Sequence, residues 1–419
     1  MRITVVGGAS TYTPELVDGL ARLRDLLPVD ELVLVDPDTE RLEVVAGMSR
    51  RMLARADHPA SVVATTDVDA GVTDADAVLL QLRVGGQAAR IKDETWPMEC
   101  GCIGQETTGA GGLAKALRTV PVVLEIAETV RKRAAEGAWI VDFTNPVGIV
   151  TRALLQAEHR AVGLCNVAIG FERYFAQLLG VTPDEVTLGH VGLNHLTWER
   201  SVTVGGRDVL GDLIEKHAAE IAEHVDQPEW LVRQLGAVPS YYLHYFYNHD
   251  EAVAAARTEP TRGARVAEIE RTLLDLYADE TVDTKPQLLG ERGGAFYSEA
   301  AINLLASLTA DRGDVQVVNL RNDGTLPFLP DDAVIEVPAT IAGSGATALP
   351  VDPVPPLYAG LISHTFGYEQ LALEAALRGG RDRVFEALLA HPLVGQVDQA
   401  QHLTDSLLAA NREHLGWAR

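Results

Sequence analysis

Apolar runs and polar stretches alternate through the first 165 residues, and this alternation predicts strands followed by helices. Short runs of valine, isoleucine and leucine are typical of strands buried on both faces of a parallel sheet. Six strands are predicted: Arg2–Val6, Glu31–Asp36, Ser61–Thr66, Asp76–Arg83, Ala138–Thr144 and Arg160–Leu164. The helices between them are expected at about 14–27, 39–56, 112–117 and 121–135. Strands that alternate with helices indicate a parallel sheet with right-handed crossovers.

The pattern changes after about Leu196, where longer helical stretches begin. Helices are expected at 210–222, 265–277 and 298–310, and again up to the C-terminus; two β-like runs interrupt them at 315–320 and 333–338. A chain of 419 residues is long for one core, so two lobes are expected. The predicted fold is α/β: a Rossmann-type, mostly parallel sheet in residues 1–166, and a mainly helical α+β lobe in residues 167–419. No linker separates the lobes, so we expect them to interleave.

The charge of the chain limits its partners. The formal net charge of −24 disfavours nucleic acid and anionic membranes, which both need a basic surface, but a few local arginines can still hold a small anion. Only three cysteines occur, Cys100, Cys102 and Cys165, which argues against a disulfide framework and for a reducing compartment. The chain opens directly into a strand without a secretory leader, and no apolar run is long enough to span a bilayer. A cytoplasmic location is therefore expected.

The turn after the first strand has the context of a dinucleotide site. A strand, a glycine turn, a helix and a second strand ending in an acid place a helix N-terminus near a pyrophosphate and a carboxylate near a ribose. The turn does not follow the usual G-x-G-x-x-G spacing, so a tight turn in a non-binding protein is the alternative. Asp36 repels a 2′-phosphate and favours NAD over NADP, whereas Arg41 would attract one. The expected cofactor-binding residues are Gly7, Gly8, Ala9, Ser10, Thr11, Asp36 and Arg41.

Cys165 and Asn166 follow the sixth predicted strand, at the sheet edge where open α/β proteins bind ligands. A lone cysteine is usually a small buried hydrophobe, and a lone histidine such as His195 is usually structural. Together, however, Cys165 and His195 offer a thiolate and an imidazole to a divalent transition metal. Two protein ligands leave coordination positions open for the hydroxyls of a substrate. No further cysteine pair suggests a structural zinc site.

Four other segments carry candidate chemistry, each with a plainer alternative. The glycine-rich loop 101–112 is either a flexible connector or the carrier of an acid, Glu106, that polarises a catalytic base. Asn145 either belongs to an ordinary strand-to-helix turn or holds a substrate hydroxyl. The tyrosine-rich segment 239–247 is either a core-facing aromatic helix or the source of a base. Arg262 and Arg292 are either solvated charges or an anion clamp.

In this order, the motifs resemble the family 4 glycoside hydrolases, which depend on NAD and a metal. The resemblance spans nearly the whole chain and departs from the family at Ala9, where a third glycine is usual. The motifs are Gly7–Ser10, Ile103–Gly109, Phe143–Pro146, Leu164–Asn166, Gly192–His195, Tyr242–Tyr245, Arg292–Gly294 and Val318–Asn322.

The resemblance implies a lactate/malate dehydrogenase-like fold and an unusual hydrolysis. NAD⁺ takes hydride from C3 of the sugar, and Mn²⁺ or another divalent metal on Cys165 and His195 acidifies the C2 proton. Tyr242 removes this proton, with Tyr241 as the alternative base and Glu106 as the tuning carboxylate. The aglycone is then eliminated, water adds, and NADH returns the hydride.

The resemblance also implies the substrate and the assembly. An asparagine at position 166 accompanies β-linked substrates in this family, so the substrate is expected to be a phosphorylated disaccharide or another 6-phospho-β-glucoside. A homodimer or homotetramer is expected. The implied substrate contacts are Arg90, Asn145, Asn166, Arg262 and Arg292, of which the arginines are candidates for the 6-phosphate.

Two other functions fit the N-terminal architecture. An NAD-dependent 2-hydroxyacid dehydrogenase of the lactate/malate type would need a histidine base paired with an aspartate, and it would have no use for Cys165 as a metal ligand. It would also form NADH stoichiometrically, whereas the hydrolase shows no net NADH. A non-catalytic NAD-binding regulator would bind NAD with indifference to Mn²⁺ and to a Cys165→Ser substitution.

Overall fold

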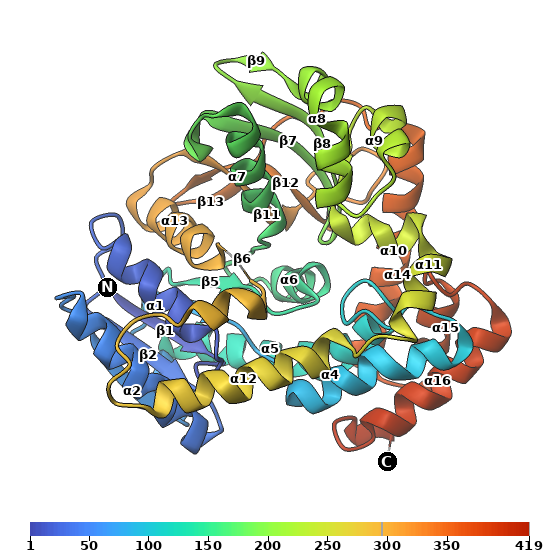
Figure 1. The fold of residues 1–419 in the computed structure, drawn as a ribbon. Coiled ribbons are helices and arrows are strands. Elements are labelled where there is room, and N and C mark those ends of the chain that lie inside the picture. The colour runs from blue at the N-terminus through green and yellow to red at the C-terminus, as the bar shows by residue number, and fades with distance from the viewer. Residues whose placement is uncertain (295, 419) are drawn as a thin grey trace.

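The computed structural model describes residues 1–294 and 296–418 and is built on one continuous sheet (Figure 1). The strand order across it is β10-β8-β7-β12-β11-β6-β5-β4-β1-β2-β3, and two further strands, β13 and β9, pair with β12 and β8. One half of the sheet is parallel and comes from the first 163 residues. The other half is antiparallel and comes from the rest of the chain, so both halves share one hydrogen-bonded layer.

The parallel half confirms the six strands predicted from the sequence. They are β1 (Arg2–Val6), β2 (Glu31–Val35), β3 (Ser61–Thr65), β4 (Ala77–Leu80), β5 (Trp139–Asp142) and β6 (Ala161–Gly163). The connecting helices are α1 (Thr13–Arg22), α2 (Thr39–Arg55), α3 (Val68–Val72), α4 (Gly86–Thr95), α5 (Gly111–Arg133) and α6 (Val147–Gln156). Strand β1 pairs in parallel with β2 on one side and β4 on the other. The carboxyl ends of these central strands therefore meet at one edge of the sheet.

The antiparallel half contains a hairpin that the sequence pattern does not predict. Its strands are β7 (Val186–Leu193) and β8 (Leu196–Val204), and the others are β9 (Arg207–Asp208), β10 (Val238–Pro239), β11 (Asp314–Arg321), β12 (Val334–Ala342) and β13 (Gly345–Ala348). The hairpin escapes prediction because His190 and Glu199 point into its interior and interrupt the apolar pattern. Strand β11 joins the halves by pairing with β6 at Asn319 and Gly163.

Helices of the C-terminal half wrap around the N-terminal half (Figure 1). Helix α12 lies against α2 and α4, and α14 and α16 pack against α5. The division at residue 166 stays a prediction, because these contacts and the shared sheet cross it. The helices are α7 (Val167–Leu179), α8 (Leu210–His224), α9 (Glu229–Leu235), α10 (His244–Tyr247), α11 (His249–Ala256), α12 (Arg262–Ala278), α13 (Tyr297–Ala310), α14 (Pro356–Arg378), α15 (Arg381–Leu389) and α16 (Val397–Asn411). Short 3-10 turns are η1 (Trp96–Cys100), η2 (Pro183–Glu185), η3 (Tyr241–Leu243), η4 (Gln287–Arg292) and η5 (Gly416–Ala418).

One predicted detail of secondary structure is wrong. The sequence predicts a break between helices at Pro121, but α5 runs through that proline. A proline inside a helix costs about 3 kcal/mol, and α5 offsets this cost because Leu117, Val120 and Val123 are fully or almost fully buried between neighbouring helices. The segment 239–247, for which an aromatic helix was one of two alternatives, divides into the end of β10, η3 and the single turn α10.

The described chain agrees with two expectations about composition. Cys100, Cys102 and Cys165 are all free thiols. No helix within residues 1–294 and 296–418 combines the length and the apolar character that a membrane span requires.

Candidate active site

The carboxyl ends of the parallel strands open into a cavity of about 720 Å³. Its walls come from the turn after β1, the end of β2, helix α4, the loop before α5, the tip of the β7–β8 hairpin and the segment η3–α10. Most of the residues predicted from the sequence line this one cavity: Gly7, Ala9, Ser10, Asp36, Arg41, Arg90, Glu106, Asn145, Asn166, His195, Tyr242, Arg262 and Arg292. Gly8, Thr11 and Cys165 are buried in the wall behind them.

The turn after β1 has the geometry that a dinucleotide needs. Gly7 has a φ of 89°, and a Cβ added there would lie 2.6 Å from the backbone oxygen of Gln81, so only glycine fits. Asp36 follows β2, and its carboxylate accepts a hydrogen bond of 3.2 Å from the backbone nitrogen of Ala9. Burial raises the pKa of Asp36 from its ordinary value. The close backbone, the start of α1 and this acid fit an NAD molecule.

A buried glutamate that sequence reasoning missed lies beside this turn. Glu270 of α12 accepts hydrogen bonds from Arg292 (2.9 Å), Arg41 (3.2 Å) and Gln87 (3.1 Å). Arg292 also donates to the Thr11 hydroxyl at 2.7 Å. The structure therefore places Arg292 and Arg41 together at the dinucleotide turn.

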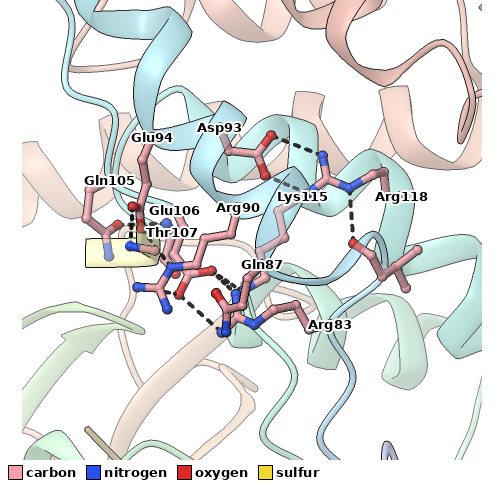
Figure 2. Close-up of polar contacts among 12 residues, drawn as sticks. Arg83, Gln87, Arg90, Asp93, Glu94, Gln105, Glu106, Thr107, Lys115 and Arg118 are labelled. Atoms are coloured by element: carbon pink, nitrogen blue, oxygen red, sulfur yellow. Dashed lines mark hydrogen bonds and ion pairs between the residues drawn. The ribbon is translucent and has the colours of Figure 1, made fainter. Parts of the chain in front are cut away.

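Glu106 is the centre of a buried ion cluster on the floor of the cavity (Figure 2). It pairs with Arg83, with Lys115 at 2.7 Å and with Arg90 at 3.2 Å. Burial opposes ionisation of Glu106, but the three cations outweigh it and hold its pKa well below the ordinary value. Burial also lowers the pKa of Lys115 to about 7 against the opposing pull of Glu106. A lysine within the apolar stretch 110–117 of α5 is the signal that could have identified this residue.

The two predicted metal ligands come from elements that the sheet brings together. Cys165 follows β6, and His195 forms the tip of the β7–β8 hairpin with a φ of 64°. The side chain of Asn194, next to His195, hydrogen-bonds to Cys165. Burial lowers the pKa of His195 to about 4, so its ring is neutral at physiological pH, and its Nδ1 is buried without a hydrogen-bond partner.

These properties fit a metal held by two protein ligands. A neutral imidazole is the form of histidine that binds a metal. Burial raises the pKa of the Cys165 thiol well above its usual value and so favours the protonated form. A cation at this position would favour the thiolate. Within the described residues no cluster of three or more His, Cys, Asp or Glu side chains is arranged to hold a metal.

Two tyrosines cover the predicted metal ligands. The ring of Tyr242 stacks on His195 with centroids 3.7 Å apart, and Tyr241 lies against Tyr242 at 4.5 Å. Burial raises the pKa values of both phenols. The hydrogen bond between them lowers the pKa of Tyr241 and raises that of Tyr242, so the geometry keeps both as candidates for the base.

The remaining polar residues predicted from the sequence also line the cavity. Asn145 follows β5 and Asn166 precedes α7. Arg90 and Arg262 interact electrostatically, which together with burial lowers the pKa of Arg262. Arg90 is braced by Glu94 at 2.7 Å, and Glu94 also accepts from the backbone nitrogen of Gly263 at 2.6 Å. Both guanidinium groups therefore belong to the same wall of the cavity, where Arg262 also donates to the backbone oxygen of Glu291 at 2.8 Å.

A second buried network that sequence reasoning missed lies behind the predicted metal ligands. His190 bridges Glu199 at 2.6 Å and Glu336 at 3.0 Å, and these carboxylates raise its pKa to about 10 against the opposing effect of burial. Glu336 also accepts from Asn194 at 2.9 Å and from Asn319 at 2.9 Å. The network fixes Asn194 and so supports the hairpin tip that carries His195.

Two sequence profiles of one protein family together match most of this chain. The sequence profile described as "Family 4 glycosyl hydrolase" matches residues 2–181, and the profile of the family's C-terminal domain matches residues 190–394. A probable 6-phospho-beta-glucosidase of Bacillus subtilis is 38% identical over 99% of this chain and 97% of its own length.

Solved structures agree with this similarity. The 6-phospho-beta glucosidase from Thermotoga maritima, solved with manganese, NAD⁺ and glucose-6-phosphate, superposes with a TM-score of 0.93 at 35% identity and covers 99% of both chains. Malate dehydrogenase from Plasmodium falciparum gives a TM-score of 0.53 at 13% identity over 90% of this chain and 99% of its own, a likeness of fold alone. These comparisons confirm the predicted fold class.

Proposed function

The chain belongs to the family 4 glycosyl hydrolases, and we propose that it hydrolyses 6-phospho-β-glucosides with NAD and a divalent metal such as Mn²⁺. The observation that carries this proposal is the meeting of four chemistries in one cavity. A dinucleotide turn, a cysteine and histidine pair, two tyrosines and a pair of arginines lie at the same sheet edge. A glycosidase that acts through two carboxylates needs neither a dinucleotide turn nor a cysteine and histidine pair.

The bound groups would supply what side chains lack: NAD⁺ would accept hydride from the sugar, and a metal held by Cys165 and His195 would act as a Lewis acid. The protein's own task is proton transfer and orientation. Tyr242 takes the proton from C2, and its stacking on His195 supports this role because it brings the phenol to the metal ligands. Positive charge at the metal position opposes the effect of burial and favours the phenolate.

The other polar residues orient the sugar. Arg90 and Arg262 bind the 6-phosphate, because paired guanidinium groups match a phosphate dianion. Asn145 and Asn166 hold sugar hydroxyls. The amide of Asn166 can hydrogen-bond but cannot protonate a leaving group, which suits a β-linked aglycone.

Glu106 tunes the site through its three cationic partners. Its negative charge reduces the positive field of the Arg83, Arg90 and Lys115 cluster next to the metal ligands. This field would otherwise disfavour a bound cation.

The structure offers less support to a 2-hydroxyacid dehydrogenase. Such an enzyme needs a histidine oriented by an aspartate, whereas His195 stacks on a tyrosine and its Nδ1 has no hydrogen-bond partner. A regulator that only binds NAD would have no use for the tyrosines and arginines across the cavity.

The decisive experiment follows the C2 proton. The protein is incubated in D₂O with NAD⁺, Mn²⁺ and 4-nitrophenyl 6-phospho-β-glucoside, and the product is analysed by NMR. Deuterium at C2 and no net NADH are expected. Cleavage without solvent deuterium at C2 would refute the elimination, and stoichiometric NADH would favour the dehydrogenase. The α-anomer is the matched control and should not be cleaved.

We also propose that the enzyme works in the cytoplasm as a homodimer or homotetramer. Free thiols at all three cysteines are compatible with a reducing compartment. Exposed apolar side chains at Trp230, Leu357 and Val397 are candidates for contacts between subunits. Light scattering of the purified protein measures the assembly directly, and a monomer would contradict the proposal.

A further inference from the structure

Five arginines line the cavity. Arg83 pairs with Glu106, and the other four form two pairs. Arg90 is paired with Glu94, and Arg262 lies close to Arg90. Arg41 and Arg292 are both paired with Glu270. Because a reaction with NAD and a sugar phosphate involves two anionic groups, the assignment of each arginine group to one anion is a question the geometry can answer.

The contacts of Arg292 lie on the dinucleotide side. Its Nε donates to Thr11 Oγ1 at 2.7 Å, its Nη2 lies 3.5 Å from Ser10 Oγ, and its guanidinium lies over the ring of Tyr12 with 5.7 Å between the central carbon and the centroid. All three partners belong to the turn between β1 and α1. This turn is where a pyrophosphate meets the N-terminus of the first helix.

Arg41 lies in the first turn of α2 and contacts the same turn between β1 and α1. Its Nε donates to the backbone oxygen of Ala9 at 2.8 Å, and its Nη2 donates to Glu270 at 3.2 Å. The first of these contacts ties the guanidinium to the turn, and Arg41 also interacts electrostatically with Asp36.

Glu270 holds the two arginines in place. It is 5% exposed, and four side chains donate to its two oxygens: Arg292, Thr11 and Gln87 to Oε1, and Arg41 to Oε2. One carboxylate between two guanidinium groups leaves one positive charge in excess within this cluster, and Asp36 lies close enough to interact with Arg41 electrostatically. Each arginine also keeps donors that are not used on Glu270.

We propose that Arg292 and Arg41, positioned by Glu270, bind the pyrophosphate of the dinucleotide, so that Arg292 serves the cofactor and not the sugar phosphate. This inference rests on the proposed function for the identity of the dinucleotide. The sequence does not distinguish arginines that bind the cofactor from arginines that bind the 6-phosphate. The proposal assigns Arg41 and Arg292 to the cofactor, and Arg90 and Arg262 to the 6-phosphate. It also makes α12 and η4, which come from the C-terminal half, part of the cofactor site.

The test compares Arg292→Gln with its matched control Arg262→Gln. NADH binding is measured by fluorescence, and binding of ADP-ribose and glucose 6-phosphate by calorimetry. ADP-ribose carries the pyrophosphate without the nicotinamide. Arg292→Gln should weaken NADH and ADP-ribose equally, by about 10- to 100-fold, and leave glucose 6-phosphate within about twofold. Arg262→Gln should show the reverse pattern.

Three results would overturn the inference: loss of glucose 6-phosphate binding alone in Arg292→Gln, no change for any ligand, or a loss for NADH without a loss for ADP-ribose. If the unmodified protein binds neither NADH nor ADP-ribose, the proposed function itself fails. Arg292→Lys keeps the charge without the fork and provides a folded comparison if the glutamine variant unfolds; it should weaken NADH less than the glutamine variant does.

A third variant tests the positioning role of Glu270. In Glu270→Gln the amide turns a donor toward one guanidinium, so that arginine is displaced although the positive charge beside the turn increases. Weaker NADH and ADP-ribose binding is expected, by several-fold, with glucose 6-phosphate binding unchanged. Unchanged or tighter dinucleotide binding would show that Glu270 does not position the arginines.

Discussion

The fold shifts the pKa of Lys115 far enough for an experiment on stability to detect the shift. This lysine is 3% exposed, and burial lowers its pKa from 10.5 to about 7 despite the contact with Glu106. The unfolded chain therefore holds one more proton than the folded chain between pH 7 and pH 10.5. Stability is expected to rise with pH through this window and to fall as the pH drops toward 7.

The size of this effect follows from the shift. One proton difference corresponds to a slope of about 1.4 kcal/mol per pH unit. On going from pH 7.5 to pH 9.0, the titration of this lysine should raise the free energy of unfolding by about 2 kcal/mol. Lys115→Met removes this contribution and leaves Glu106 paired with Arg83 and Arg90, so the variant is expected to fold.

The assay is urea denaturation followed by tryptophan fluorescence at both pH values, without NAD or metal. The gain in stability on going to pH 9.0 should be about 2 kcal/mol larger in the unmodified protein than in Lys115→Met. Lys132→Met, at an exposed position of the same helix, should keep the full gain. Equal pH dependence in the unmodified protein and Lys115→Met would refute the argument that burial controls this lysine.

Three further predictions concern stability, the base and the metal. Asp93→Asn should destabilise the protein by about 3–5 kcal/mol in urea denaturation, because it leaves Arg118, paired at 2.5 Å and almost fully buried, without its counter-charge; a loss below about 1 kcal/mol, the level of an exposed pair, would contradict this. Tyr242→Phe should lower kcat by about 10²- to 10⁴-fold and abolish C2 exchange in D₂O, and full exchange in this variant with none in Tyr241→Phe would move the base to the neighbour. Cys165→Ser should weaken Mn²⁺ binding by at least about tenfold in calorimetry while NADH binding is kept, and unchanged Mn²⁺ affinity would remove Cys165 from the ligand set.

The dinucleotide end could be predicted because its signals are local. A strand, a glycine turn and a helix follow one another within 22 residues, and Gly7 occupies a backbone conformation that only glycine tolerates well. Asp36 is found by its position at the end of a strand. Such features depend on neighbours in the chain, so the hydrophobic pattern and the residue types suffice.

The buried charges could not be predicted in the same way. His190 and Glu199 occupy strand positions where the pattern expects apolar residues, and their mutual neutralisation exists only when β7 pairs with β8 and β12 supplies Glu336. The position of Lys115 in an apolar stretch marks it as unusual, but the sequence gives no sign of Glu106, the carboxylate with which it pairs.

The sequence by itself determined the order of the elements, the dinucleotide turn, the family and the residue types available for chemistry. Only the tertiary structure decided which of them share a cavity and which carboxylates the arginines contact. Arg292 is 281 residues from Thr11 along the chain but donates to its hydroxyl, while Arg262, nearer in sequence to Arg292, lies beside Arg90. The physical reason is that local conformation follows from adjacent residues. Charge pairing and the geometry of a ligand site depend on distances that exist only after the sheet has formed and α12 has packed against α2 and α4.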